Sequence, residues 1–133
     1  MLWDRGTELF EKGSALRLRS YAGHSLFTWK GPKIEDPVLK IRPEIETLVA
    51  DASALEGILR ALGFAPVMVM EKTRALWRSA DLTACLDETP FGCFLELEGS
   101  PIAIHNAMNA LGLDATLAEA RSYPTLFREN GLA

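Results

Sequence analysis

Charged residues alternate with apolar residues in several segments of this sequence. Arg17 and Arg19 are separated by one leucine, and Glu96 and Glu98 are separated in the same way. Residues i and i+2 of a strand lie on one face, so each segment pairs an apolar face with a strip of charge. The same spacing relates Lys40, Arg42, Glu44 and Glu46 within Val38–Val49, and Lys72, Arg74 and Arg78 lie within Val67–Arg78. Several strips that carry both signs suggest a barrel with a polar lumen, which suits a polyanion held with a divalent metal.

The basic residues of these strips have the chemistry of a phosphate site. Arginine offers a planar fork of donors to phosphate oxygens, and lysine offers a mobile point charge. Inward projection from neighbouring strands would bring them to one place. The residues expected to bind phosphate groups in this way are Arg17, Arg19, Lys30, Lys72 and Arg74.

The acidic residues of the later strips are candidate metal ligands. Asp87, Glu96 and Glu98 supply hard oxygen ligands of the kind that hold Mg²⁺ or Mn²⁺ together with substrate phosphates. Metal and arginines together would stabilise the charge that shifts in phosphoryl or nucleotidyl transfer. The alternative is that each strip is the solvated face of an open sheet, which is the usual state of a single charged strand face. Because several strands carry charged strips of the same kind, a binding site is favoured over a set of solvated strand faces.

Composition and length limit the class of protein. A chain of 133 residues forms one domain, and its net charge of −4 argues against a general nucleic-acid binder. No apolar run approaches the roughly 20 residues that cross a bilayer, and the first residues lack the order of a signal peptide. Cys85 and Cys93, the only cysteines, fall in strand-like segments. Together these features predict a cytoplasmic, reduced protein with neither a membrane nor a nucleic acid as its partner.

The elements that must position these residues are mostly strands. A possible short strand is expected at Glu8–Phe10, followed by strands at Ala15–Tyr21, Ser25–Lys30, Val38–Val49, Val67–Arg78, Leu82–Glu88 and Gly92–Glu98. Helices are expected at Ala52–Leu62 after an Asp51 cap, from Ser100-Pro101 to Leu111 with Gly112 as the stop, and from Ser122 through Arg128. The predicted fold class is α+β, an antiparallel β-barrel with flanking helices.

Ordered motifs along nearly the whole chain resemble the CYTH superfamily, the triphosphate tunnel metalloenzymes. They are Leu16-Arg17-Leu18-Arg19, Thr28-Trp29-Lys30-Gly31-Pro32, Arg42-Pro43-Glu44-Ile45-Glu46, Glu71-Lys72-Thr73-Arg74, Leu86-Asp87-Glu88-Thr89-Pro90-Phe91-Gly92 and Phe94-Leu95-Glu96-Leu97-Glu98-Gly99. Ser122-Tyr123-Pro124 resembles the branch of class IV adenylate cyclases. The resemblance implies an eight-stranded antiparallel tunnel that binds triphosphates with Mg²⁺ or Mn²⁺.

The resemblance also implies roles for individual residues. Family members make cyclic AMP from ATP, or hydrolyse thiamine triphosphate or inorganic tripolyphosphate. By position, Arg17, Arg19, Lys30, Lys72 and Arg74 match the phosphate-binding bases, Asp87, Glu96 and Glu98 the metal ligands, and Glu44, Glu46 and Lys72 the catalytic residues. Which of these triphosphates is the substrate stays open at this point.

One motif of the family is absent from this sequence. The family opens with a strand bearing Glu-x-Glu-x-Lys and a helix, whereas Met1 falls where the family approaches its second strand. We therefore expect a single CYTH-like domain over residues 1–133 that lacks this strand and helix. An unpaired edge would favour a homodimer. The alternative to a triphosphate enzyme is an impaired relative that binds polyphosphate or nucleotide, or acts as an oligomeric non-enzymatic protein.

Overall fold

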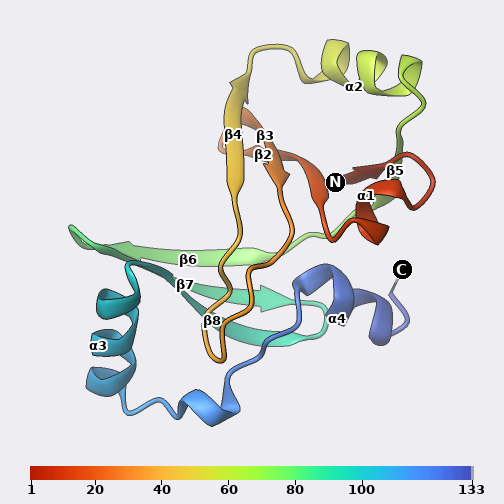
Figure 1. Ribbon diagram of the computed structural model, residues 1–133. Coiled ribbons are helices and arrows are strands. Elements are labelled where there is room, and N and C mark those ends of the chain that lie inside the picture. The colour runs from red at the N-terminus through yellow and green to blue at the C-terminus, as the bar shows by residue number, and fades with distance from the viewer. Residues whose placement is uncertain (133) are drawn as a thin grey trace. The chain divides into compact units, whose positions relative to one another are not determined.

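The computed structural model describes residues 1–132, which form two compact units (Figure 1). Unit 1 comprises Met1–Asp36 and Lys40–Met70, and unit 2 comprises residues 37–39 and 71–132. Both units combine antiparallel strands with helices, so the predicted α+β class is confirmed. None of the described helices is both long enough and apolar enough to cross a membrane.

Unit 1 is built on a five-stranded antiparallel sheet with the order β4-β3-β2-β1-β5. Its strands are β1 (Leu2–Asp4), β2 (Ala15–Tyr21), β3 (His24–Lys30), β4 (Glu44–Val49) and β5 (Ala65–Met68), and its helices are α1 (Glu8–Glu11) and α2 (Ala52–Ala61). The β2–β3 hairpin turns at Ala22 and Gly23, which both have positive φ, 47° and 78°. A two-residue turn of this kind matches the twist of the strands that it joins.

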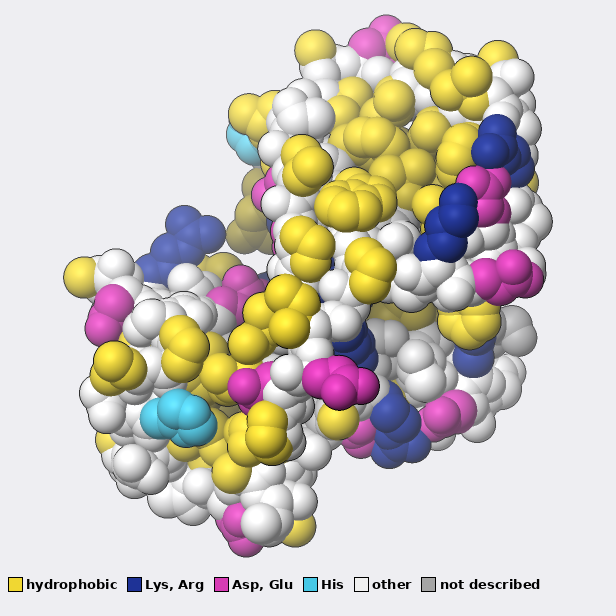
Figure 2. Space-filling model, in the orientation of Figure 1, with side chains coloured by type: hydrophobic (Ala, Val, Ile, Leu, Met, Phe, Trp, Pro, Cys, Tyr) yellow, Lys and Arg dark blue, Asp and Glu magenta, His cyan; other side chains and the backbone are white. Residues whose placement is uncertain are grey.

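The core of unit 1 lies on one face of this sheet. Trp3, Leu18 and Leu59 are buried against one another, and Leu59 comes from α2. Helix α2 starts as predicted, because the Asp51 side chain accepts a hydrogen bond from the Ala54 N–H at 2.9 Å. Figure 2 shows hydrophobic side chains gathered over this unit, between β4 and β5 and below α2. Burial of this apolar face fixes which face of β2 and β3 is left for the charged residues.

The first residues of the chain differ from the prediction. The short strand expected at Glu8–Phe10 is wrong, because this segment is helix α1, and strand β1 precedes it. The buried Asp4 explains the helix: its carboxylate accepts hydrogen bonds from the backbone N–H groups of Leu9, at 2.9 Å, and Phe10, at 3.1 Å. A carboxylate in this position satisfies the unpaired donors of a helix start.

The long strand predicted at Val38–Val49 is also wrong in its first half, because β4 begins only at Glu44. The preceding loop is held by other contacts. The Gly31 N–H donates to the Pro43 carbonyl at 2.8 Å, and the Arg42 guanidinium donates to the carbonyls of Gly31, at 2.8 Å, and Gly13, at 3.1 Å. Arg42 therefore binds backbone instead of extending the charged strip of a strand. Proline has no N–H for a strand ladder, which agrees with a strand that starts just after Pro43.

Unit 2 contains a three-stranded antiparallel sheet with the order β6-β7-β8. Its elements are β6 (Thr73–Arg78), β7 (Leu82–Thr89), β8 (Gly92–Gly99), α3 (Pro101–Leu111), the short 3-10 helix η1 (Ala115–Leu117) and α4 (Tyr123–Glu129). The single strand predicted at Val67–Arg78 is wrong, because β5 pairs with β1 and β6 pairs with β7.

The helix ends of unit 2 confirm the predicted signals. Helix α3 has Ser100 as its cap, which accepts from the Ala103 N–H at 3.2 Å, and it ends at Gly112 with a φ of 66°. Helix α4 starts after Ser122, which accepts from the Thr125 N–H at 3.3 Å. The position of this helix start fixes where the Tyr123 side chain lies within unit 2.

Candidate functional site

The predicted site residues of unit 1 share the face of the five-stranded sheet opposite the core. Lys30 lies opposite Glu44 in the register, and Thr28 lies opposite both Arg17 and Glu46. The other member of the set, Arg19, lies two residues after Arg17 on β2 and therefore on the same face. Arg17, Arg19, Lys30, Glu44 and Glu46 therefore lie on one face of the sheet.

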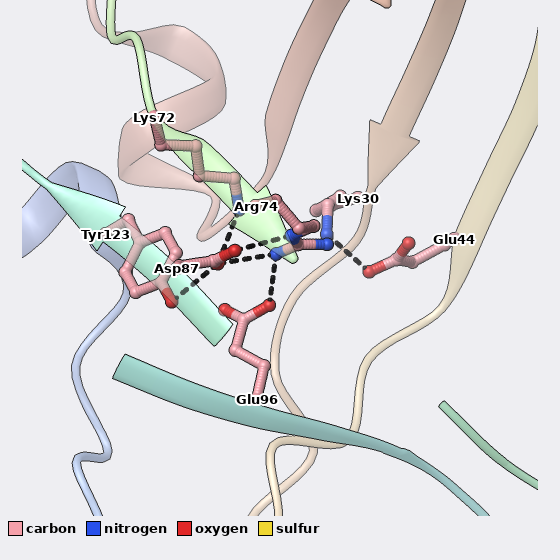
Figure 3. A network of polar contacts seen from close by, with 7 residues as sticks. All are labelled: Lys30, Glu44, Lys72, Arg74, Asp87, Glu96 and Tyr123. Carbon is pink, nitrogen blue, oxygen red and sulfur yellow. Dashed lines mark hydrogen bonds and ion pairs between the residues drawn. The ribbon is translucent and has the colours of Figure 1, made fainter. Parts of the chain in front are cut away.

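Both acidic side chains on this face have a partner on β3. The Lys30 ammonium forms an ion pair with Glu44 at 2.7 Å, which Figure 3 shows as a contact between facing strands. The fully buried Thr28 donates its hydroxyl to Glu46 at 2.6 Å. These contacts fix the two carboxylates, so Glu44 and Glu46 are held in defined positions on the sheet. The sequence placed Thr28 in a motif but gave it no role of its own, because a threonine in a strand is common.

Part of the Arg19 side chain is buried and unsatisfied. Its Nε atom is buried and has no hydrogen-bond partner among the described residues. A buried donor without a partner costs free energy, and a bound anion can supply the missing acceptor. Arg19 is therefore suited to bind a phosphate oxygen.

Two predicted bases of unit 2, Lys72 and Arg74, converge on the carboxylate of Asp87 (Figure 3). Asp87 on β7 is fully buried, and it lies opposite Arg74 on β6 in the register. The Nε and Nη2 atoms of Arg74 donate to its two oxygens, each at 2.6 Å, and Lys72 Nζ donates at 2.7 Å. Arg74 Nη2 also donates to Glu96 at 2.7 Å. The structure thus brings Lys72, Arg74, Asp87 and Glu96 together.

Tyr123 on α4 completes this network. Its hydroxyl donates to Asp87 Oδ2 at 2.8 Å, and Lys72 Nζ lies 4.8 Å from the centre of its ring. The ring also packs against Phe94, with centroids 5.4 Å apart. The sequence marked Tyr123 only as part of a motif at a helix start. Its contact with Asp87, 36 residues away in the chain, was not visible in any local pattern.

The contacts shift the pKa values of this network in a consistent way. Burial raises the pKa of Asp87, but hydrogen bonds from Arg74, Lys72 and Tyr123 outweigh burial and lower it to about 2. Burial lowers the pKa of Lys72, and Asp87 partly opposes this effect. Burial and the hydrogen bond to Asp87 both raise the pKa of Tyr123. Asp87 is therefore ionised and Tyr123 is neutral over the ordinary pH range.

These acidic residues do not form a metal centre as they stand. The described part of the chain contains no group of three or more His, Cys, Asp or Glu side chains arranged to hold a metal ion. Both oxygens of Asp87 accept hydrogen bonds, Glu96 is paired with Arg74, and Glu98 is exposed. The metal roles predicted for Asp87, Glu96 and Glu98 stay predictions.

The CYTH domain matches residues 5–111 of the chain. The chain belongs to the CYTH domain family. Its sequence is 40% identical, over 91 residues, to a candidate adenylate cyclase of Methanocaldococcus jannaschii, a match that covers 68% of this chain and 51% of the relative. This CYTH chain therefore spans about half the length of the curated relative that it matches.

Solved structures of similar proteins show the same fold as this CYTH chain. The PH1819 protein of Pyrococcus horikoshii is 28% identical with a TM-score of 0.81, covering 97% of this chain and 81% of that one. A candidate adenylyl cyclase from Hippeastrum with a dominant triphosphatase activity is 18% identical with a TM-score of 0.71, covering 97% of this chain and 80% of that one. The resemblance seen in the sequence motifs is thus confirmed at the level of family and fold.

Proposed function

We propose that this CYTH chain binds a triphosphate through its basic residues and turns it over by phosphoryl or nucleotidyl transfer. The observation that carries the proposal is the charged face of unit 1, where Arg19 has a buried Nε without a hydrogen-bond partner among the described residues. A phosphate oxygen would satisfy this donor. The proposed triphosphate-binding residues are Arg17, Arg19, Lys30, Lys72 and Arg74.

The proposed contribution of the protein to turnover is electrostatic. Arginine and lysine side chains held in place before the reaction stabilise charge as it moves onto the transferring and leaving oxygens. Glu44 and Glu46 would orient water or the attacking hydroxyl, because Lys30 and Thr28 fix their positions. Lys72 would act with them as a further positive charge beside the phosphates.

A divalent metal is part of this proposal through family membership. Triphosphate tunnel metalloenzymes depend on such a cation, and Mg²⁺ or Mn²⁺ suits carboxylate and phosphate oxygens. The described acidic residues do not enclose a site by themselves, so we assign no step to the metal. Asp87, Glu96 and Glu98 remain the candidate ligands from the sequence.

The relatives support two kinds of turnover. The Methanocaldococcus relative is a candidate adenylate cyclase, and the Hippeastrum relative has a dominant triphosphatase activity. For this chain we accordingly propose either formation of cyclic AMP from ATP or hydrolysis of thiamine triphosphate or tripolyphosphate. The second candidate function is binding of polyphosphate or nucleotide without turnover, which is consistent with carboxylates already engaged by protein donors.

Ligand-induced stabilisation tests the binding step. A ligand that binds only the folded state raises the melting temperature, so millimolar tripolyphosphate should do so, and more with Mg²⁺. Arg17→Ala and Arg74→Ala should each reduce the shift, and Lys12→Ala, which removes an exposed charge directly after α1, should not. Assays for cyclic AMP and released phosphate then separate turnover from binding alone. The absence of any shift with the wild-type chain would overturn the proposal.

We also propose that the chain forms a homodimer in the cytoplasm through an open sheet edge. Strands β4 and β5 are the outer strands of the five-stranded sheet, and an outer strand presents unpaired backbone groups that invite pairing. Light scattering at low micromolar concentration tests the dimer. A monomer of full stability would contradict it.

A further inference from the structure

We infer that Asp87 and Tyr123 are positioning residues: Asp87 holds Arg74 and Lys72 in place for the ligand, and Tyr123 holds Asp87. This role differs from the metal-binding role that the sequence predicted for Asp87. The inference rests on the proposed function, because it concerns the bases that are proposed to bind the triphosphate. It assigns a role to Tyr123 that the sequence did not suggest.

The first argument is that four protein donors surround the Asp87 carboxylate, three at Oδ2 and one at Oδ1. It accepts four hydrogen bonds, two from Arg74, one from Lys72 and one from Tyr123, with donor–acceptor distances of 2.6–2.8 Å. An ionised carboxylate has about four acceptor sites. Asp87 is also fully buried, so its carboxylate contacts protein donors and is closed to solvent.

The second argument is that Asp87 leaves ligand-binding donors of the two bases available. Arg74 uses Nε and Nη2 on Asp87 and Glu96, whereas its Nη1 has no partner among the described residues. Lys72 makes one hydrogen bond through its ammonium group, which can donate three. The carboxylate thus holds the Arg74 guanidinium and the Lys72 ammonium through some of their N–H groups. The remaining N–H groups can donate hydrogen bonds to phosphate oxygens. Fixing the guanidinium before the ligand arrives lowers the entropy cost of binding.

The third argument concerns the rigidity of Tyr123. Its ring packs against Phe91 and Phe94, with centroids 5.7 Å and 5.4 Å away. The start of α4 is fixed by the Ser122 cap. The fixed ring therefore holds the hydroxyl in position to donate a hydrogen bond to Asp87. This donor is neutral, so it does not change the charge of the network. Lys72 lies over the same ring, so Tyr123 contacts both the carboxylate and one of the bases.

Binding of tripolyphosphate without metal, in the presence of EDTA, tests the inference by titration calorimetry. Asp87→Asn removes a negative charge beside two bases. On electrostatic grounds alone, the variant would bind the anion more tightly than the wild type does. If Asp87 positions the bases, the affinity falls instead, by about tenfold, the loss expected when a charge-assisted contact is broken. Tyr123→Phe leaves the charge unchanged and should weaken binding by about threefold, since it removes one hydrogen bond.

Two matched controls accompany these variants. Glu88→Gln removes the same charge from the neighbouring residue of β7, whose exposed side chain lies on the opposite face of the sheet. Tyr21→Phe makes the same change at the other tyrosine of the chain, which is exposed. Both controls should bind tripolyphosphate as the wild type does. Equal affinity of wild type and Tyr123→Phe, or tighter binding by Asp87→Asn, overturns the inference.

Two further measurements separate this inference from a metal role and from the proposed function. The affinity for Mn²⁺ in the presence of saturating tripolyphosphate should be unchanged in Tyr123→Phe and Asp87→Asn, and a selective loss of Mn²⁺ affinity in Asp87→Asn would make Asp87 a metal ligand. The Nε–H signal of Arg74 in NMR spectra should exchange slowly in the wild type and fast in Asp87→Asn, without any ligand. If the wild type binds no tripolyphosphate, the proposed function fails. If Asp87→Asn leaves the exchange of the Arg74 signal unchanged, the positioning role fails, whatever the outcome of the binding experiment.

Discussion

Arg74 and Asp87 face each other as a register pair of β6 and β7, and the guanidinium donates to both carboxylate oxygens at 2.6 Å. The pair is bidentate, and the carboxylate side of it is fully buried. Such a contact depends on a planar fork, which lysine cannot provide. It also places the Arg74 side chain between Asp87 and Glu96, so one base joins two of the predicted acidic residues.

Arg74→Ala should destabilise the protein because it leaves Asp87 buried with only Lys72 and Tyr123 as partners. We expect the free energy of unfolding to fall by about 1.5–3 kcal/mol, the range for hydrogen bonds to charged groups. Urea denaturation measures this change. Arg78→Ala, at an exposed position on the same strand, should change the free energy by less than about 0.5 kcal/mol. Similar losses for both variants would mean that the bidentate pair contributes no more to the free energy of unfolding than an exposed arginine does.

The stability of the protein should depend on acid pH through Asp87. Its folded-state pKa of about 2 lies below the ordinary value of 3.8, so its contribution is present above about pH 4 and is lost as the pH falls towards 2. Asp87→Asn should therefore be less stable than the wild type at neutral pH. The difference in the free energy of unfolding should shrink between about pH 4 and about pH 2. A difference that stays constant over this interval would contradict the low pKa.

Arg19→Met should separate binding from stability. The substitution removes a buried donor that has no hydrogen-bond partner among the described residues, so the melting temperature without ligand should stay equal or rise. The stabilisation by tripolyphosphate should fall, with an affinity about tenfold lower, if this arginine binds phosphate. Thermal shift and calorimetry on the same samples measure both effects. Loss of stability without loss of affinity would make Arg19 a structural residue.

Thr28→Val should cost stability through Glu46. Valine has nearly the same shape but cannot donate to the Glu46 carboxylate, which now accepts from Thr28 at 2.6 Å. We expect a loss of about 1–2 kcal/mol in the free energy of unfolding, measured by denaturant titration. Thr47→Val is the matched control, because Thr47 is exposed on β4 and makes only a 3.4 Å contact with its neighbour's carbonyl. Equal effects at the two positions would show that the hydrogen bond to Glu46 contributes little.

The sequence by itself determined that Arg17 and Arg19 share a strand face and where helices α2, α3 and α4 begin. Alternation with period two is local, so the shared face of Arg17 and Arg19 could be predicted without knowing the sheet. Helix signals are local as well, as the Asp51 and Ser100 caps show. The ordered motifs, taken together, were enough to indicate the CYTH family.

Only the tertiary structure decided which strand pairs with which and what each charged side chain contacts. The continuous pattern of Val67–Arg78 could not reveal that β5 and β6 join different sheets, because hydrogen-bond partners are distant in the chain. For the same reason the sequence could not reveal that the register with Arg74 and the position of Tyr123 surround Asp87 with protein donors. A local pattern determines on which face of a strand a side chain lies, and long-range packing determines which groups that side chain contacts.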